Sequence, residues 1–361
     1  MNDFKLHVAG LRAEVDAAVA RVLESGWFIL GKEVEAFEQE FAAFVGVPHA
    51  IGVGNGMDAI QLALMAWGIG PGDEVITTPN SAFATTLAIL RVGATPVFVD
   101  IEDRDYALDS RLLAAAITPR TKALLPVHIY GRAAELAPMV ELADKHGLLL
   151  LNDACQAHGA QYRGHDVSHY GHATAYSFYP TKNLGCFGDG GMIVCSDAEH
   201  AARMRRGRDY GQSKRYEHLE PGLNSRLDEV QAAVLRVKLK HLAAHTQRRR
   251  AVAARYQQAL AGLPIVLPRP DAGAVWHLFV LRTPRRDALA EHLRGRGVQS
   301  LVHYPTIIPK QAAMGRPYAA GSLPVAERCA DEFLSLPINP ELTDAQVDEV
   351  CAAVRSFFEA A

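Results

Sequence analysis

Short apolar segments of strand-forming residues alternate with helical patterns through the first two thirds of this 361-residue chain. The segments expected to be strands are residues 75–78, 96–99, 123–127, 148–152 and 173–178. Helical patterns separate them, for example after residue 56 and after residue 134. Strands joined through helices run parallel, and both of their faces are buried. The pattern therefore predicts an α/β protein with a mainly parallel sheet, whose ligands bind at the carboxyl ends of the strands.

The last third of the sequence has a different organisation. A long helical pattern covers residues 227–260. Shorter segments follow, strand-like at 277–283 and 301–304 and helical at 285–297 and 344–360. We expect a large domain at residues 1–245 and a smaller α+β domain at residues 246–361.

Charge and composition exclude several classes of protein. Lysine and arginine number 37 against 40 aspartate and glutamate residues, so the formal net charge is −3 and no overall basic field favours nucleic acid. No apolar run reaches the roughly 18 residues that span a bilayer. The first 26 residues have the pattern of an amphipathic helix rather than a signal peptide. We expect a globular, cytoplasmic protein that binds neither nucleic acid nor membranes.

The cysteines and histidines do not indicate a metal site. The five cysteines form no C-x-x-C pair and their number is odd, which argues against a disulfide framework and a structural zinc. His165, His169 and His172 are closely spaced, but their glycine-containing segment is predicted to be a loop. Ordinary surface histidines are the better interpretation, and we expect no metal.

A glycine-rich turn at residues 52–59 is the first candidate for ligand binding. Gly54, Gly56 and Ala59 fit the G-x-G-x-x-G/A pattern of dinucleotide-binding turns. The acid that should end the next strand is missing there, so the pattern is only half present. A helix start with free N–H groups suits a phosphate. A tight turn that needs a positive φ explains the same glycines equally well.

Two further residues have positions that suit catalysis. Asp153 directly follows a predicted strand, where it is either an active-site acid or a helix N-cap. Lys182 lies among apolar and glycine-rich residues, which lowers the pKa of an amine and makes it competent to form a Schiff base. A phosphate-binding helix start, a strand-end carboxylate and such a lysine are the groups that pyridoxal 5′-phosphate requires.

With these residues in place, the sequence resembles the fold-type I sugar aminotransferases of the DegT/DnrJ type. The similar segments follow the family's order along nearly the whole chain, from SGWFILGKEVEAFE at residues 25–38, through GNGMDA, NDACQAHGA, SFYPTKNLGCFGDGG and GLNSRLDEVQAAVL, to LSLPI at residues 334–338. The resemblance implies a large domain with a mainly parallel, seven-stranded sheet between helices, followed by a smaller α+β domain.

The resemblance also implies contacts with pyridoxal phosphate for eight residues: Gly56, Met57, Phe83, Asp153, Gln156, Ser177, Lys182 and Asn224. Lys182 is the expected catalytic residue and forms the Schiff base. Asp153 is expected at the pyridine nitrogen, Gln156 at the 3′-oxygen, and Phe83 stacked on the ring.

The phosphate contacts are implied in the same way. The N–H groups of Gly56 and Met57 and the hydroxyl of Ser177 are expected to bind the phosphate, and Asn224 is expected to reach it from the partner subunit. Where the family usually has threonine this chain has Met57, so a hydroxyl ligand is missing and the backbone N–H remains.

A second departure from the family falls in the segment HYPTIIPKQ. Ile307 and Pro309 stand where the family has proline and histidine, so the loop expected to face the substrate differs. His128 and Tyr179 are further candidates for a contribution to catalysis beside Lys182. The arginine-rich residues 203–215 are expected to meet a nucleotide diphosphate.

The activity that the resemblance implies is transamination by a homodimer with shared active sites. An amino acid, L-glutamate, would donate its amino group to a nucleotide-linked keto-sugar, at C3 of a dTDP-3-keto-6-deoxyhexose. The alternatives are a 4-keto-sugar aminotransferase and a non-enzymatic regulator that binds pyridoxal phosphate. A sugar dehydratase would have histidine in place of Lys182, and a nicotinamide dehydrogenase is the rival that the glycine pattern leaves.

Overall fold

A seven-stranded sheet forms the centre of the computed structural model, which describes residues 4–315 and 317–359. Its strand order is β1-β9-β8-β5-β4-β2-β3. The strands are β1 (His49–Val53), β2 (Glu74–Thr77), β3 (Thr95–Phe98), β4 (Thr121–Leu125), β5 (Leu149–Asp153), β8 (Ala173–Ser177) and β9 (Gly191–Cys195). All five predicted strands are present, within one or two residues of their expected bounds, and the predicted α/β class is confirmed.

The sheet is parallel except at β9. The neighbouring strands β3, β2, β4, β5 and β8 all run in one direction. β9 lies between β8 and β1 and is antiparallel to both. Val53 at the end of β1 and Ser177 at the end of β8 both pair with Gly191. The carboxyl ends of β1, β8 and β5 therefore meet at one edge of the sheet.

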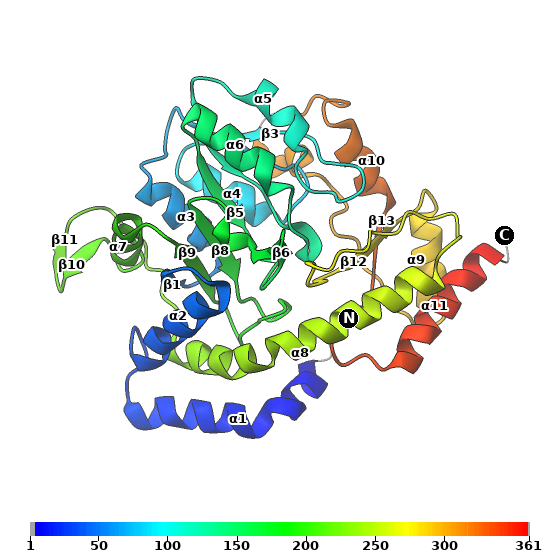
Figure 1. Ribbon diagram of the computed structural model, residues 1–361, viewed down its shortest axis with the longest axis horizontal. Coiled ribbons are helices and arrows are strands. Elements are labelled where there is room, and N and C mark those ends of the chain that lie inside the picture. Colours follow the sequence, from blue (N-terminus) through cyan, green and yellow to red (C-terminus); the bar gives the residue numbers. More distant parts are fainter. Residues whose placement is uncertain (1–3, 316, 360–361) are drawn as a thin grey trace.

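Helices cover both faces of the sheet, as Figure 1 shows. Because neighbouring residues in a strand point to opposite faces, Leu125 and Leu151 pack with α3 (Gly56–Ala66), α4 (Phe83–Arg91) and α7 (Ala198–Gly207). Leu124 and Leu150 pack on the other face with α5 (Leu113–Ala116) and α6 (Leu136–His146). On that second face, α2 (Lys32–Val45) and α8 (Glu229–Ala259) cover β8, β9 and β1.

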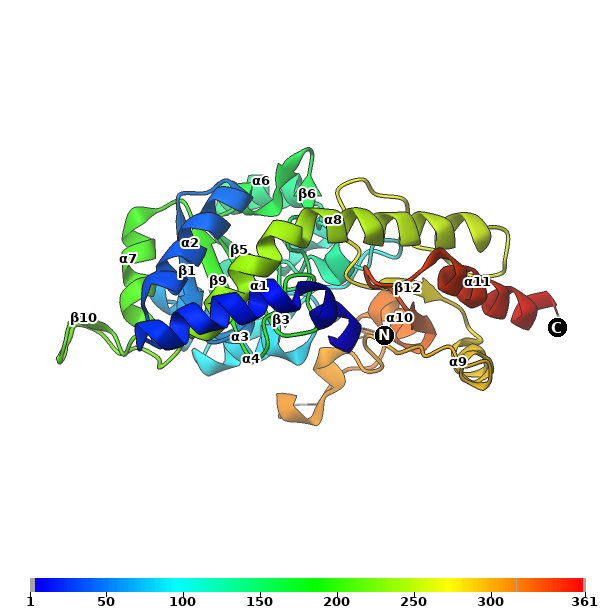
Figure 2. The ribbon, with the colours of Figure 1, turned by 90° about the horizontal axis from the view of Figure 1, so that it is seen from below.

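The first helix, α1 (Phe4–Ser25), lies along α8 (Figure 2). Its buried residues, Leu11, Val15, Ala18 and Val22, recur every three or four positions and so form one apolar stripe. That stripe packs on Val234 and its neighbours in α8. Residues 1–3 of the predicted N-terminal helix lie outside the described residues.

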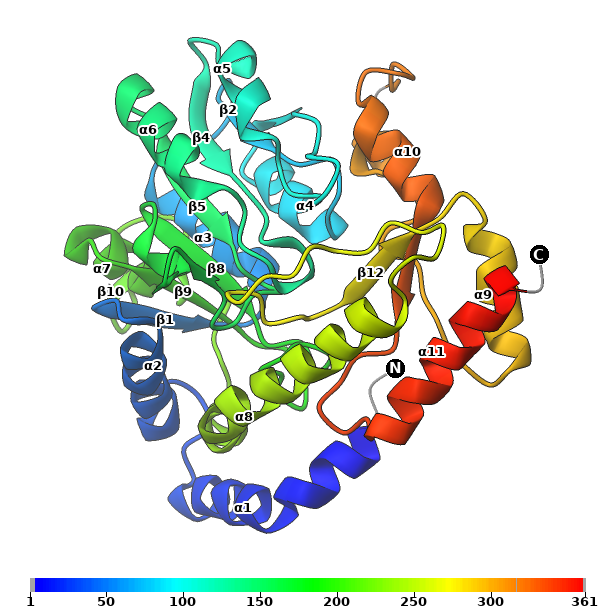
Figure 3. The same ribbon diagram turned by 45° about the vertical axis from the view of Figure 1, so that its right-hand side comes forward.

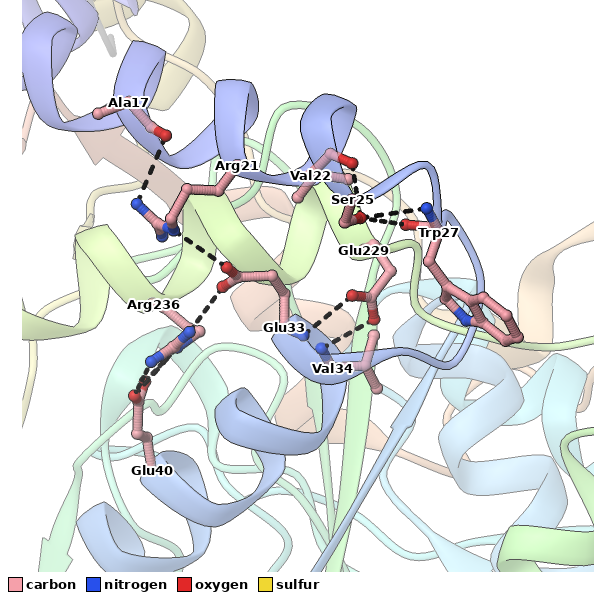
Figure 4. Close-up of polar contacts among 10 residues, drawn as sticks. All are labelled: Ala17, Arg21, Val22, Ser25, Trp27, Glu33, Val34, Glu40, Glu229 and Arg236. Atoms are coloured by element: carbon pink, nitrogen blue, oxygen red, sulfur yellow. Dashed lines mark hydrogen bonds and ion pairs between the residues drawn. The ribbon is translucent and has the colours of Figure 1, made fainter.

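Glu229, at the start of α8, fixes the segment between α1 and α2. Its buried carboxylate accepts hydrogen bonds from the backbone N–H groups of Gly31, Glu33 and Val34, at 2.8, 2.9 and 3.0 Å. These donors belong to the first turn of α2, which has no side-chain cap of its own. About two turns farther along α8, Arg236 pairs with Glu33 and with Glu40 of α2 (Figure 4).

The C-terminal part has its own apolar core, to which Phe279, Leu281 and Leu334 contribute. β12 (Phe279–Arg282) pairs antiparallel with β13 (Phe333–Leu336). Helices α9 (Arg286–Gly295), α10 (Pro324–Glu332) and α11 (Asp344–Glu359) gather around this pair (Figure 3). The proposed boundary at residue 246 would fall inside α8, which runs unbroken from the sheet to this part, and the division stays a prediction.

One predicted strand is wrong. Residues 301–304 form no strand, because Leu301 alone pairs, in an isolated bridge to Ser335 of β13. The following residues run toward the large sheet, where the N–H of Ile308 donates to the carbonyl of Pro79, after β2, at 2.9 Å.

The remaining elements are short. They are β6 (Gln161–Tyr162), β7 (His165–Asp166), β10 (Gln212–Lys214), β11 (Glu217–His218) and the 3₁₀ turns at 110–112, 129–131, 167–169, 308–310 and 312–314. Within residues 4–315 and 317–359, no helix combines the length and the apolar character needed to cross a membrane.

Candidate active site

A cavity of about 310 Å³ opens at the sheet edge where β5 and β8 end and α3 begins. Six of the eight predicted site residues line it: Gly56, Met57, Asp153, Gln156, Ser177 and Lys182. These residues span 127 positions of the sequence (182 − 56 + 1), so only the fold brings them together. Parallel strands end at a common edge, and this geometry produces the grouping.

Asp153, the last residue of β5, has a buried carboxylate with two donors. The Thr85 hydroxyl donates to Oδ2 at 2.7 Å, and the Cys155 N–H donates to Oδ1 at 3.1 Å. Sequence reasoning missed both partners. Thr85 lies 68 residues away, two positions after Phe83, and nothing near it in the sequence links its hydroxyl to Asp153, whereas an Asx-type turn at Asp153 could have indicated Cys155.

The start of α3 is built to approach the ends of the strands. Asn55 caps the helix by accepting the Asp58 N–H at 2.9 Å. A Cβ on Gly56 would lie 2.7 Å from both the Cys155 sulfur and the Ser177 Cβ, so only glycine fits there. The Gly56 and Met57 N–H groups are the first two of the helix and have no acceptor within it. They can therefore bind an anion beside the Ser177 hydroxyl.

A hydroxyl from the start of the long helix region supports this turn. Ser225 donates to the Asp58 carboxylate at 2.6 Å and accepts the Gly54 N–H at 3.0 Å. Gly54 and Asp58 lie on either side of the N-terminus of α3, where the phosphate is expected. The two hydrogen bonds of Ser225 therefore fix the chain before and after this N-terminus. The sequence places Ser225 next to Asn224 but gives no sign of this contact.

Lys182 follows β8 in a turn, with its N–H donating to the Tyr179 carbonyl at 2.9 Å. Burial lowers the pKa of its ammonium, while negative charge at Cys155 and Asp153 acts in the opposite direction. Burial is the larger cause, so a greater share of the amine is neutral than in an exposed lysine. The desolvation predicted from the sequence is therefore supported.

Gln156 is buried and held at both ends of its amide. Its Oε1 accepts the Tyr130 N–H at 2.8 Å, and its Nε2 donates to the Tyr304 hydroxyl at 3.1 Å. Tyr304 belongs to the connection between α9 and α10, so Gln156 joins the sheet to the C-terminal part. One Nε2 hydrogen stays available for a ligand oxygen.

Two predicted site residues do not line the cavity. Phe83 begins α4 and is half-buried, and its neighbours Ala82 and Ala84 line the cavity instead. Asn224 is exposed on the surface of its own protomer and bridges to Asp209. Stacking by Phe83 and a contact from Asn224 to a partner's site stay predictions.

The altered loop residues face inward. Ile307 is 2% exposed and packs with Tyr106 and Tyr130, and Pro309 is also buried. With isoleucine and proline at these positions, the loop offers no polar side chain to a substrate from residue 307 or 309.

His128 and Tyr179 behave differently. His128 is fully buried and does not line the cavity, and burial lowers its pKa to about 4. Tyr179 lines the cavity and is 53% exposed.

The closely spaced histidines have separate structural partners. His169 contacts the Val45 carbonyl at 3.0 Å, and His172 accepts the Leu150 N–H at 3.0 Å. In the part of the chain that the structure describes, no three His, Cys, Asp or Glu side chains are arranged to hold a metal ion.

The arginine-rich segment is engaged in ion pairs and backbone contacts within the protomer. Arg206 pairs with Glu220 at 3.1 Å, Arg205 donates to the Ala50 carbonyl, and Arg208 pairs with Glu38. A contact with a nucleotide diphosphate stays a prediction for this segment.

Comparison with known proteins covers nearly the whole chain. The DegT/DnrJ/EryC1/StrS aminotransferase family matches residues 10–355. A Streptomyces venezuelae protein named dTDP-3-amino-3,4,6-trideoxy-alpha-D-glucose transaminase is 52% identical, across 99% of this chain and 95% of its own length. The erythromycin biosynthesis sensory transduction protein EryC1 of Saccharopolyspora erythraea is 50% identical, across 96% of each chain.

Among solved structures, S. venezuelae DesV in complex with a ketimine intermediate has a TM-score of 0.97 and 52% sequence identity. The match covers 99% of this chain and 97% of that one. It extends through the sheet, α8 and the C-terminal part together, which confirms the predicted fold type. By sequence and by structure, the chain belongs to the DegT/DnrJ/EryC1/StrS aminotransferase family.

Proposed function

We propose that this aminotransferase uses pyridoxal 5′-phosphate to move an amino group from L-glutamate to C3 of a dTDP-linked 3-keto-6-deoxyhexose. The observation that carries the proposal is the meeting of an amine and a carboxylate in one cavity, since Lys182 and Asp153 both line it. The name of the 52% identical relative specifies a 3-amino dTDP-sugar, which supports the position and the nucleotide.

The cavity suits the cofactor in volume and in donors. About 310 Å³ lies at the lower end of the range for small-molecule sites. A Cβ on Gly56 would lie only 2.7 Å from the Ser177 Cβ, so glycine lets the start of α3 approach Ser177 closely and brings helix N–H groups and a hydroxyl together as donors for a phosphate. Asp153 keeps unused lone pairs beyond its two donors, so it can also accept a ring N–H.

When bound, the cofactor supplies a protonated pyridine ring that takes up the electron pair of a breaking C–H bond. Asp153 keeps the proton on the ring nitrogen, because a carboxylate stabilises a nearby positive charge. Lys182, with its lowered pKa, would take the proton of the donor's α-carbon onto Nζ and give it up again later in the reaction. The helix start at Gly56 and Met57 anchors the phosphate, which holds the reacting atoms in register.

We propose a homodimer as the active unit. Trp27, Phe28 and Ile29 are consecutive and are 62%, 50% and 39% exposed, an apolar patch that a partner subunit would cover. Asn224 is also exposed, as a residue that serves a neighbour's site must be. The cytoplasmic location expected from the sequence stays a prediction.

Two alternatives differ from this proposal in measurable ways. A 4-keto-sugar aminotransferase would share every cofactor contact and differ only in which ring carbon it presents. A regulator would bind the cofactor without turnover, and the name of the 50% identical relative keeps this alternative in view. The half-buried, pKa-lowered Lys182 favours an enzyme.

The test is an assay of the purified protein with L-glutamate and the 3-keto and 4-keto dTDP-sugars side by side. We expect faster amination of the 3-keto isomer and a visible absorption band from bound pyridoxal phosphate. Faster amination of the 4-keto isomer would overturn the position alone. A protein that binds the cofactor and turns over neither sugar with any amino donor would favour the regulator.

A further inference from the structure

We propose that Thr85, oriented by Ser81, is a positioning residue that holds the Asp153 carboxylate in the plane in which it meets the cofactor ring. The proposal rests on the proposed function, because it assigns a role toward pyridoxal phosphate. It concerns hydroxyl groups to which neither the sequence pattern nor the resemblance gives a role.

The two hydroxyls form a directed chain that ends at the carboxylate. Thr85 Oγ1 lies 2.7 Å from Asp153 Oδ2 and 2.9 Å from Ser81 Oγ. An ionised carboxylate only accepts hydrogen bonds, so the single hydroxyl hydrogen of Thr85 points to Asp153. Ser81 must then donate to Thr85. Both residues line the cavity and are buried, at 4% and 1% exposure, so water does not compete effectively for these bonds.

The contacts to Asp153 fix its orientation from two sides. Thr85 approaches one carboxylate oxygen from the first turn of α4, and the Cys155 N–H approaches the other from the turn after β5. Two donors from different elements prevent the carboxylate from rotating. Thr85 is also two residues after Phe83, so the same helix turn carries the side chain expected to stack on the ring. The start of α4 would thus set both the stacking face and the ring-nitrogen partner.

The chain supplies a matched control in the next residue. Thr86 is 0% exposed in the same helix, and its Oγ1 has no hydrogen-bond partner among the described residues. Thr85→Val and Thr86→Val remove the same atom from adjacent buried positions. Only the first removes a donor from Asp153, whereas the second removes a hydroxyl that pairs with nothing.

The experiment compares the wild type with Thr85→Val, Thr85→Ser and Thr86→Val. Pyridoxal phosphate is titrated into each cofactor-free protein, and the pH midpoint of the visible band is measured for each loaded enzyme. We expect Thr85→Val to bind the cofactor about ten-fold more weakly, as for a lost hydrogen bond to a charged group. Its band midpoint should move to higher pH, because a less firmly protonated ring withdraws less charge from the Lys182 nitrogen. Thr85→Ser and Thr86→Val should match the wild type.

Equal cofactor affinity and equal band midpoints for Thr85→Val and Thr86→Val would overturn this inference and leave the proposed function intact. A wild type that takes up no pyridoxal phosphate would overturn both. If Thr85→Val does not fold, Ser81→Ala takes its place. A two- to five-fold weaker affinity is then expected, and an unchanged affinity overturns the inference.

Discussion

The sheet edge and the loop at residues 301–310 meet at Gln156, but they are built differently. At the sheet edge, Asp153 is 4% exposed and takes its donors from neighbouring elements. In the loop, His303 and Tyr304 are only partly buried, and the Ile308 N–H to Pro79 bond helps to join it to the sheet. Groups that must stay fixed relative to the cofactor lie on the densely packed edge, whereas the loop is anchored by its buried Ile307 and Pro309 and leaves the partly exposed His303 and Tyr304 to adapt to substrate.

Removing the amine from the sheet edge should have the largest effect. We expect Lys182→Ala to lower the transamination rate by about 10³-fold or more, because the variant lacks the amine that is proposed to move the proton of the donor's α-carbon. Steady-state assays with a protein free of contaminating transaminases would measure it. Lys182→Arg, which keeps the charge but not a titrating amine, should be equally inactive. Residual activity near the wild-type level would refute the role of Lys182.

Acid should destabilise the sheet more than the loop. Burial lowers the pKa of His128 to about 4 and that of His158 to about 3, from about 6.5 in the unfolded chain. Below about pH 6.5 these histidines bind protons in the unfolded chain but stay neutral in the folded protein. The free energy of unfolding therefore falls as the pH drops from about 6.5 to about 4. The loss is about 3 kcal/mol for His128 alone.

Urea denaturation at pH 7 and pH 4.5 measures this loss, and His128→Gln should flatten the difference. His303 in the loop has a similarly lowered pKa but is partly exposed, so His303→Gln should flatten it less. If His128→Gln and His303→Gln reduced the pH dependence of the unfolding free energy equally, the sheet and the loop would not differ in their sensitivity to acid.

Crowding the start of α3 should weaken cofactor binding without abolishing it. In Gly56→Ala the new methyl group would lie 2.7 Å from the Cys155 sulfur and the Ser177 Cβ, so the helix start must retreat from the strand ends. We expect about ten-fold weaker binding of pyridoxal phosphate, which an equilibrium titration measures. Gly68→Ala offers a control, since a Cβ there meets nothing within 4 Å, although its positive φ adds some strain. Unchanged affinity in Gly56→Ala would contradict a phosphate site there.

The smallest effect is expected in the loop. Tyr304→Phe removes the acceptor of the Gln156 Nε2 hydrogen bond but leaves the Tyr130 N–H contact that holds the other end of the amide. We expect a change of about three-fold in KM for the sugar, in line with a single neutral hydrogen bond. A loss larger than that of Gly56→Ala would reverse the ranking of the two regions.

The same contrast explains how much of the molecule could be predicted. The five strands, Asp153 and Lys182 were accessible because apolar runs and strand-end positions are local features of the sequence. Residues 301–304 have a strand's pattern but pair only at Leu301, since a strand needs a partner that the pattern does not specify. The Thr85 to Asp153 and Ser225 to Asp58 hydrogen bonds join residues 68 and 167 positions apart, so no short motif contains them.

The single helix α8 also limits how the molecule can move. With 31 residues it is about 46 Å long, and it carries the chain from the sheet to the C-terminal part without a joint. The buried Arg249 donates to the carbonyls of Trp276, His277 and Ile338. These hydrogen bonds attach the second half of α8 to the C-terminal part. The C-terminal part therefore cannot swing on a flexible linker at this connection. A displacement of loop 301–310 toward the cofactor must either flex a stiff rod or be confined to the loop itself.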